Sequence, residues 1–130
     1  MKVESVLECL QDMYAGFLAH DQVQFDRHLS PEVTTWETHL PRLMNRLELD
    51  SYRDLRPPGK RPVLADLRIQ DPHIDVWGKH AVARYELVSF PKDEDEAVEV
   101  RRVTDVLLNN KGNWVIVHHH AELWKVGQDA

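Results

Sequence analysis

The sequence predicts an α+β fold in which helices near the N-terminus cover one face of a curved antiparallel sheet. Two observations support this prediction. Apolar side chains recur at helical spacing from Val3 to His20, and the chain from Val63 onward alternates between β-rich runs and short turns. Consecutive strands joined by short turns are antiparallel. Because the helices precede the strands instead of alternating with them, the pattern indicates α+β architecture.

The composition is that of one ordinary globular domain. The chain has 130 residues, of which 42% are hydrophobic and 29% charged, so it can bury a core without metal or disulfide. Its formal net charge of −6 and its scattered basic residues argue against nucleic acid binding. Cys9 has no second cysteine to pair with, which favours a reducing compartment. No apolar run approaches the roughly 20 residues of a membrane span. We therefore expect a cytoplasmic single domain over residues 1–130.

The N-terminal segment predicts two helices. Val3–His20 has apolar residues on one side and polar residues on the other, as in an amphipathic helix that packs on a flat surface. Asp21, followed three residues later by Gln24, has the capping-box spacing that opens a second, short helix. Ser30-Pro31 is expected to end this helix, because proline disfavours helical geometry in the residue before it.

The next segment predicts a strand and two short helices. Val33–Trp36 is β-branched and aromatic, which is typical of a strand. Pro41 suits the first position of a helical turn, and Asp50 suits the N-cap of another helix that runs through Tyr52. Arg56–Lys60 contains two prolines and a glycine and is expected to form a loop.

Five strands are expected in the second half of the chain, with Asp71-Pro72 interrupting the first pair and Gly78-Lys79 forming a tight turn. Their expected bounds are Val63–Gln70, Ile74–Trp77, Ala81–Phe90, Val98–Leu108 and Trp114–Trp124. Strict alternation along the last strand places His119 on one face with Val115, Val117, Ala121 and Leu123. The same alternation places His118 and His120 on the other face with Trp114, Ile116 and Glu122.

Four local sequences, in their order, resemble the nuclear transport factor two-like (SnoaL-like) superfamily. They are Val33–Glu37, Leu49–Arg53, Asp71–Gly78 and Gly112–His120, and they are most similar to the association domain of calcium/calmodulin-dependent protein kinase II. The resemblance implies a cystatin-like cone with a pocket between the helices and the concave sheet face. It also implies dimers or larger rings formed through the convex face. Steroid isomerases, dehydratases and non-catalytic assembly domains share this cone, so the fold alone does not define a function.

The resemblance also implies which positions line the pocket. Tyr52 occupies the position of a pocket histidine, while Val88, Asp105 and Ala121 occupy positions of pocket arginines, so those charges are absent here. Strand alternation adds further lining residues to these positions. The expected ligand-binding set is Trp36, Tyr52, Arg84, Glu86, Asp105 and His119. Asp105 and His119 are expected within hydrogen-bond reach on neighbouring strands.

Two functions are compatible with that set. One is a module that binds a small, largely apolar molecule in its central pocket, with Asp105, His119, Arg84 and Glu86 as a satisfied polar network. The other is an acid–base isomerase, dehydratase or cyclase, with His119 as base, Asp105 orienting it and Tyr52 polarising a carbonyl or hydroxyl. The sequence contains no nucleophile elbow, phosphate loop or cofactor fingerprint, so we predict no cofactor.

The remaining histidines and the uncovered sheet face predict assembly. His118 and His120 could ligate zinc only with a further ligand such as Glu122, His73 or Asp75; a role in a dimer interface is favoured, and we predict no metal site. Apolar residues expected on the convex face are too numerous to leave in water. The residues expected on this face are Ala83, Tyr85, Leu87, Thr104, Val106, Trp114 and Ile116. A homodimer or higher homo-oligomer is therefore expected, and a charged residue at Trp114 is expected to break it.

Overall fold

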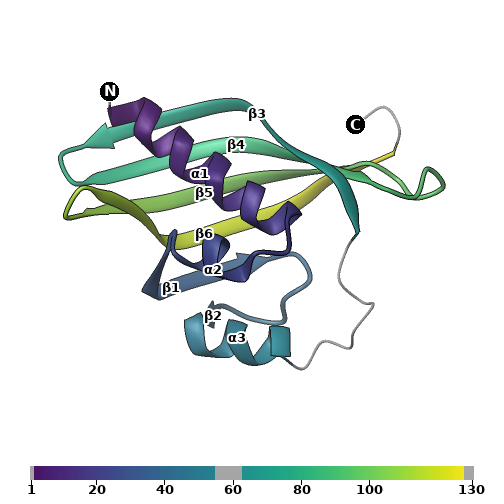
Figure 1. Cartoon of the computed structure of the whole chain (residues 1–130), viewed down its shortest axis with the longest axis horizontal. Helices are drawn as coiled ribbons and strands as arrows, with labels where there is room; N and C mark the ends of the chain where they lie inside the picture. The colour runs from purple at the N-terminus through teal and green to yellow at the C-terminus, as the bar shows by residue number, and fades with distance from the viewer. Residues whose placement is uncertain (1, 55–62, 128–130) are drawn as a thin grey trace.

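The computed structural model describes residues 2–54 and 63–127, which form a curved six-stranded sheet with helices on one side (Figure 1). The strand order is β2-β1-β6-β5-β4-β3. This arrangement confirms the predicted α+β cone. The sheet is mixed, however, because β1 runs parallel to β6, a pairing between distant segments that local patterns do not reveal. None of the described helices is long and apolar enough to cross a membrane.

The first three described elements follow the predicted order, and the later ones differ from it at β2, α3 and β3. Their bounds are α1 Lys2–Leu18, α2 Gln22–Asp26, β1 Leu29–Glu37, β2 Met44–Asn45, α3 Arg46–Asp54, β3 Leu64–Trp77, β4 His80–Pro91, β5 Glu99–Asn110 and β6 Asn113–Val126.

Helix α2 begins as predicted but ends earlier. The Asp21 side chain accepts a hydrogen bond from the backbone N–H of Gln24 at 3.0 Å, which confirms the N-cap. The helix stops at Asp26, and Ser30-Pro31 lies inside β1. The chain can leave the helix here because Leu29 already pairs with Ile116 of β6.

Of the two helical segments predicted after β1, the turn at Pro41 is wrong, whereas the helix through Tyr52 is present as α3 and begins earlier than predicted, at Arg46. No helical turn starts at Pro41; instead β2 pairs with β1 through Met44 opposite Thr35. The single helix α3 is capped by Asn45, whose Oδ1 accepts from the backbone N–H of Glu48 at 2.9 Å. Asp50 lies within α3 and accepts from the Arg46 guanidinium one turn earlier. The predicted loop at Arg56–Lys60 lies outside the described residues.

The predicted break at Asp71-Pro72 is a β-bulge within one continuous strand. The register of β3 against β4 shifts between Gln70 and His73, and Asp71 has a φ of 51°. Strand β3 is at the edge of the sheet, so a proline there removes no hydrogen bond that a neighbouring strand needs.

A second bulge, in β6, decides which residues face the helices. Val106 pairs with His118 but Leu107 pairs with Ile116, so Val117 is an extra residue. Trp114 and Ile116 before the bulge face α1 and are buried, and His119 and Ala121 after it face the same side. The prediction that His119 shares a face with Val115 and Val117 is therefore wrong, because strict alternation does not survive an inserted residue.

The core lies between α1 and the concave side of the sheet, and it contains most of the residues predicted for the convex face. Helix α1 contributes Val6, Leu10 and Met13 to this core. The sheet residues that were predicted to be uncovered but are buried here are Ala83, Tyr85, Leu87, Trp114 and Ile116. Trp114 also donates its indole N–H to Ser5 of α1 at 3.0 Å. Trp114 is thus a core residue, and changing it would test folding instead of assembly.

Candidate functional site

A row of five polar side chains crosses the space between α1 and the sheet. His119 Nδ1 lies 2.5 Å from Asp105 Oδ1, and His119 Nε2 lies 3.3 Å from Glu37 Oε1. Tyr85 donates to the second Asp105 oxygen at 2.6 Å. The Tyr14 and Tyr85 hydroxyl oxygens are 2.6 Å apart. We call these five residues the buried network; it joins α1, β1, β4, β5 and β6.

The predicted contact between Asp105 and His119 is present, and the β6 bulge makes it closer than expected. The two residues are directly opposite each other on β5 and β6. Without the extra residue in β6, Asp105 would lie opposite Val117 and only diagonal to His119. The bulge therefore converts a diagonal pair into a facing pair.

The charge on His119 follows from its two carboxylate neighbours. Burial alone would lower the pKa of His119, but the charge of Asp105 and the hydrogen bonds to Asp105 and Glu37 together raise it to about 10. The ring is therefore an imidazolium at neutral pH, with an N–H directed at each carboxylate. An imidazolium has no free lone pair, so the predicted role of His119 as a general base does not fit this geometry.

The other members of the buried network are held in fixed protonation states. Burial would raise the pKa of Glu37, but its hydrogen bond to His119 and the His119 charge lower it below its ordinary value. Burial and the nearby Asp105 charge raise the pKa of both Tyr14 and Tyr85 well above the ordinary value. Both phenols therefore stay protonated, and Glu37 stays ionised, at neutral pH.

Arg84 and Glu86 are not part of the site, contrary to prediction. Arg84 alternates with buried Ala83 and Tyr85, so it lies on the uncovered face, where it donates to Asp75 at 2.7 Å. Glu86 lies on that same face, paired across the strands with Arg102. The prediction assumed that Val88 faces the helices and counted every second residue from it. Tyr85 faces the helices instead, and Val88 points to the opposite side of the sheet.

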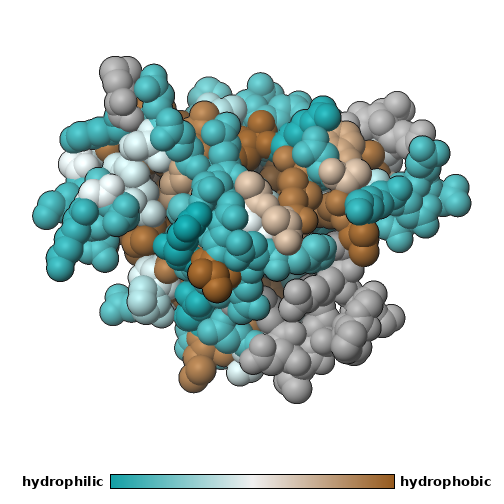
Figure 2. Space-filling view, viewed as in Figure 1, coloured by the Kyte–Doolittle hydropathy of each residue, from teal (hydrophilic) through white to brown (hydrophobic). Residues whose placement is uncertain are grey.

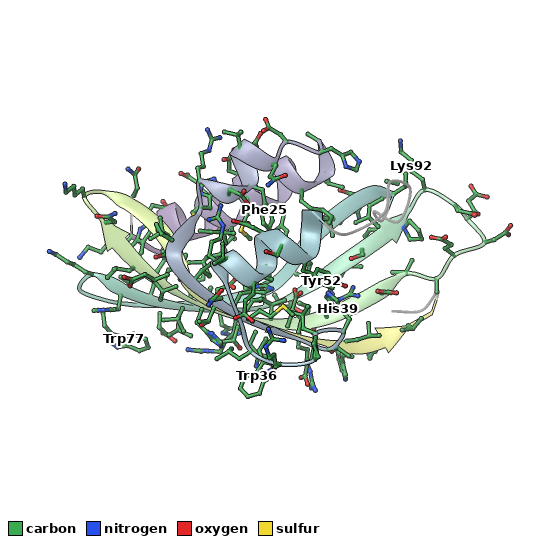
Figure 3. All side chains as sticks on the ribbon, turned by 90° about the horizontal axis from the view of Figure 1, so that it is seen from below. Phe25, Trp36, His39, Tyr52, Trp77 and Lys92 are labelled. Atoms are coloured by element: carbon green, nitrogen blue, oxygen red, sulfur yellow. The ribbon has the colours of Figure 1, made fainter. Side chains whose placement is uncertain are left out.

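Trp36 and Tyr52 lie on opposite sides of the sheet (Figure 3). Trp36 is 53% exposed on the side away from the helices, with its ring 6.2 Å from that of His120. It is therefore not a wall of the concave side. Tyr52 of α3 lies on the helix side, with its ring 6.2 Å from that of His39. His39 Nε2 is 3.5 Å from Glu37, so Tyr52 is close to the Glu37 end of the buried network.

Three residues of the buried network, Tyr14, Tyr85 and Glu37, were missed by the sequence prediction. Tyr14 is on the buried stripe of α1, and Tyr85 shares the buried face of β4 with Ala81 and Ala83. A phenol hydroxyl on an otherwise apolar face needs a hydrogen-bond partner. This need for a partner was the signal in the sequence, and it indicated a contact with the acidic residues of neighbouring strands.

An open groove of about 350 Å³ lies between α1 and β3, next to the buried network. Its lining residues are Gln11, Tyr14, Ala15, Leu18, Leu67, Arg68 and Ile69. Tyr14 belongs to both the groove and the network. On the face that shows α1, apolar surface appears in several places among hydrophilic side chains (Figure 2). None of the six residues predicted to bind a ligand lines this groove.

A separate row connects Cys9, His28 and Asp12. Cys9 Sγ is 3.4 Å from His28 Nδ1, and His28 Nε2 is 2.6 Å from Asp12 Oδ2. Burial and the charges of Asp105 and Asp12 raise the pKa of the Cys9 thiol to about 12. The thiol is therefore protonated at neutral pH, and it packs in the core.

The three consecutive histidines have different surroundings. His118 Nδ1 is 2.7 Å from the Thr34 hydroxyl, and His120 is exposed beside Trp36. Within residues 2–54 and 63–127, the His, Cys, Asp and Glu side chains form no group of three or more that could hold a metal ion. The third ligand that a zinc site at His118 and His120 would require is thus not supplied by these residues.

Stability is expected to fall as the pH rises from about 6.5 to about 10. The pKa of His119 is about 10 in the folded chain and 6.5 ordinarily, so the folded state binds the extra proton and its stabilisation is complete below pH 6.5. It is lost as the pH approaches 10, by at most about 1.4 kcal/mol per pH unit. Urea unfolding across this range measures the slope. His119→Gln should flatten it; an equal slope in that variant would contradict the assignment.

The curved sheet with N-terminal helices on one side defines an α+β cone. The SnoaL-like domain family matches residues 6–122. The chain therefore belongs to the SnoaL-like family, as its local sequences predicted.

Solved structures of low sequence identity share the fold. The CamKII hub homology domain of Chlamydamonas reinhardtii is 21% identical over 96% of this chain and 100% of that chain, with a TM-score of 0.79. A protein from Parabacteroides distasonis assigned as a ketosteroid isomerase is 20% identical over 92% of this chain and 86% of that one, with a TM-score of 0.73. An NTF2-like protein of unknown function from Pseudomonas putida is 10% identical over 93% and 85%, with a TM-score of 0.81. A comparison with curated proteins gave no match.

Proposed function

We propose that this chain is a binding and assembly module without catalytic activity. It holds a small, largely apolar ligand between α1 and the sheet, and it pairs with a second copy through the uncovered sheet face. The groove of about 350 Å³ is the observation that supports ligand binding. Its volume is within the range of ligand sites, about 300–1,000 Å³. Its lining is mostly apolar or aromatic, with Gln11 and Arg68 as the polar exceptions.

The buried network supports binding without chemistry. Both ring nitrogens of His119 face carboxylates, and both Asp105 oxygens accept from protein donors. Groups that satisfy one another in this way are not poised to exchange protons with a ligand. The contacts of the network instead connect five elements, α1 among them, and fix the position of Tyr14, which lines the groove.

Filling the groove is expected to abolish ligand binding. Ala15 is an exposed residue of α1 that lines the groove, so Ala15→Trp would place an indole where the ligand lies. The probe is 1-anilinonaphthalene-8-sulfonate, whose aromatic body suits the apolar lining and whose sulfonate suits Arg68. Its fluorescence titration should show binding at least about tenfold weaker in the variant, the equivalent of about 1.4 kcal/mol.

Ala19→Trp is the matched control, because Ala19 follows the end of α1 and is not among the groove residues. It should bind the probe as the native chain does. The ligand site would be rejected if the native chain does not bind the probe, or if both tryptophan variants bind it equally well.

The uncovered sheet face has an apolar patch suited to pairing with a second copy. Val82 pairs with Val106 and Leu108 pairs with Val115 across adjacent strands. The patch consists of the half-buried residues Val82, Val106, Leu108, Val115 and Val117 and the exposed Trp77; Figure 3 shows Trp77 on the side away from the helices. Continuous apolar surface of this kind is typical of protein interfaces. Similarity to CamKII hub and association domains also supports assembly.

A charge in this patch is expected to separate the subunits. The native chain should have about twice its chain mass of 15.2 kDa in light scattering, and Val82→Glu should have the monomer mass because a dimer would bury two unpaired carboxylates. Val23→Glu is the control, since Val23 is a highly exposed residue of α2. A monomeric native chain, or a dimeric Val82→Glu variant, would count against this interface.

An acid–base isomerase, dehydratase or cyclase is the alternative, favoured by the position of Tyr14, which lines the groove and contacts Tyr85, the donor to the buried Asp105 carboxylate. In that case Glu37, the partly exposed end of the network, would accept the proton in place of His119. Deuterium uptake at the acidic carbon of a bound ketone, lost in Glu37→Gln, would favour the enzyme over the module.

A further inference from the structure

The hydrogen bonds of the buried network all point in one direction. Asp105 accepts from His119 on one oxygen and from Tyr85 on the other. Since the Tyr85 hydrogen is directed at Asp105, the Tyr85 oxygen can only accept in its contact with Tyr14. The Tyr14 hydrogen must therefore lie in the 2.6 Å contact between the two phenols.

This direction determines what Tyr14 can offer to a ligand. Its hydroxyl hydrogen is already used, but its oxygen retains acceptor capacity. Donation along a chain of hydrogen bonds also polarises each hydroxyl, which makes the first oxygen of the chain a stronger acceptor. Tyr14 lines the groove and is 8% exposed, so a ligand that reaches its hydroxyl meets an acceptor and no available donor.

We propose that the groove selects apolar molecules bearing a hydrogen-bond donor, an alcohol, a phenol or an amine, over ethers and ketones of the same shape. The ligand donates to Tyr14 Oη, and its apolar body packs against Leu18, Leu67 and Ile69. This inference rests on the proposed ligand site and adds the chemical class of the ligand. A ketone or ether in the same position would bring its oxygen against the Tyr14 oxygen with no hydrogen between them.

The test compares 2-naphthol with 2-methoxynaphthalene, which share two fused rings and differ in the hydroxyl hydrogen. Their affinities for the full chain are measured by fluorescence titration. The native chain is expected to bind 2-naphthol about fivefold more tightly, the effect of one neutral hydrogen bond. Tyr14→Phe is expected to bind the two probes equally.

Tyr85→Phe gives a second, opposite readout. It removes the acceptor of Tyr14, so the Tyr14 hydrogen becomes available to a ligand, and 2-methoxynaphthalene should gain relative to 2-naphthol. This variant tests the inference even where Tyr14→Phe does not fold, because the Tyr14 ring that lines the groove is retained.

Three results would overturn the inference: equal affinities in the native chain, an undiminished preference in Tyr14→Phe, or an unchanged preference in Tyr85→Phe. The outcomes also separate this inference from the proposed ligand site. If both probes bind equally and Ala15→Trp blocks both, the groove stands and the donor preference fails. If neither probe binds the native chain, the ligand site itself fails.

Discussion

Replacing Asp105 with asparagine is expected to lower the free energy of unfolding by about 3 kcal/mol. Asp105 is 0% exposed and accepts hydrogen bonds from His119 and Tyr85. Asparagine has nearly the same size, so the main change is the loss of a negative charge beside a buried imidazolium. Glu37, at 3.3 Å, would remain as the other carboxylate beside that ring. Urea unfolding of both chains measures the difference.

Glu122→Gln is the matched control for this substitution. Glu122 forms an ion pair of 2.7 Å with Arg102 on the surface, where the side chains are 46% and 53% exposed, and such pairs contribute little, about 0–1 kcal/mol. Adding His119→Gln to Asp105→Asn should recover part of the lost stability, because no unbalanced imidazolium is left. A loss no larger than that of Glu122→Gln would show that Asp105 and His119 do not form a stabilising ion pair.

Leu10→Ala is expected to cost about 3 kcal/mol of stability. Leu10 is 0% exposed and packs from α1 into the core above the sheet. Removing its isobutyl group takes away apolar contacts and leaves a cavity that the surrounding strands cannot fill. Denaturant unfolding and the midpoint of thermal unfolding should both report the loss.

Leu47→Ala is the corresponding control on α3. Leu47 is 75% exposed, so the same change of residue in a helix should alter stability by less than about 0.5 kcal/mol. Both substitutions change helix propensity equally, and the comparison therefore isolates burial. Equal losses in the two variants would contradict the packing of α1 on the concave face.

Most elements of the fold, though not β2, could be predicted from local sequence because they have a periodic or capping signal. The apolar stripe of α1, the Asp21 cap and the turn at Gly78 are local features, and the structure has all three. The ordered local sequences also indicated the SnoaL-like cone. Among the candidate site residues, Asp105 and His119 were correctly placed in contact.

The orientation of the strands could not be predicted in the same way. Strand side chains repeat with a period of two, so one inserted residue exchanges the faces of everything beyond it. Because of the bulge at Val117, Trp114, Ile116 and His119 all face the helices. On β4 the prediction counted from the wrong residue, so it placed Arg84 and Glu86, instead of Tyr85, on the helix side. Each error moved a residue to the opposite side of the sheet while leaving the strand itself correct.

The sequence by itself determined most of the helices and strands, though not β2 or the start of α3, and that a histidine and an aspartate meet on neighbouring strands. Only the tertiary structure decided that Tyr14, Tyr85 and Glu37 complete that pair and that both nitrogens of His119 face carboxylates. The physical reason is that local conformation depends on neighbours within a few residues. The partners of a buried polar group come instead from strands and a helix up to about a hundred residues apart, brought together by a parallel β1–β6 pairing and a bulge.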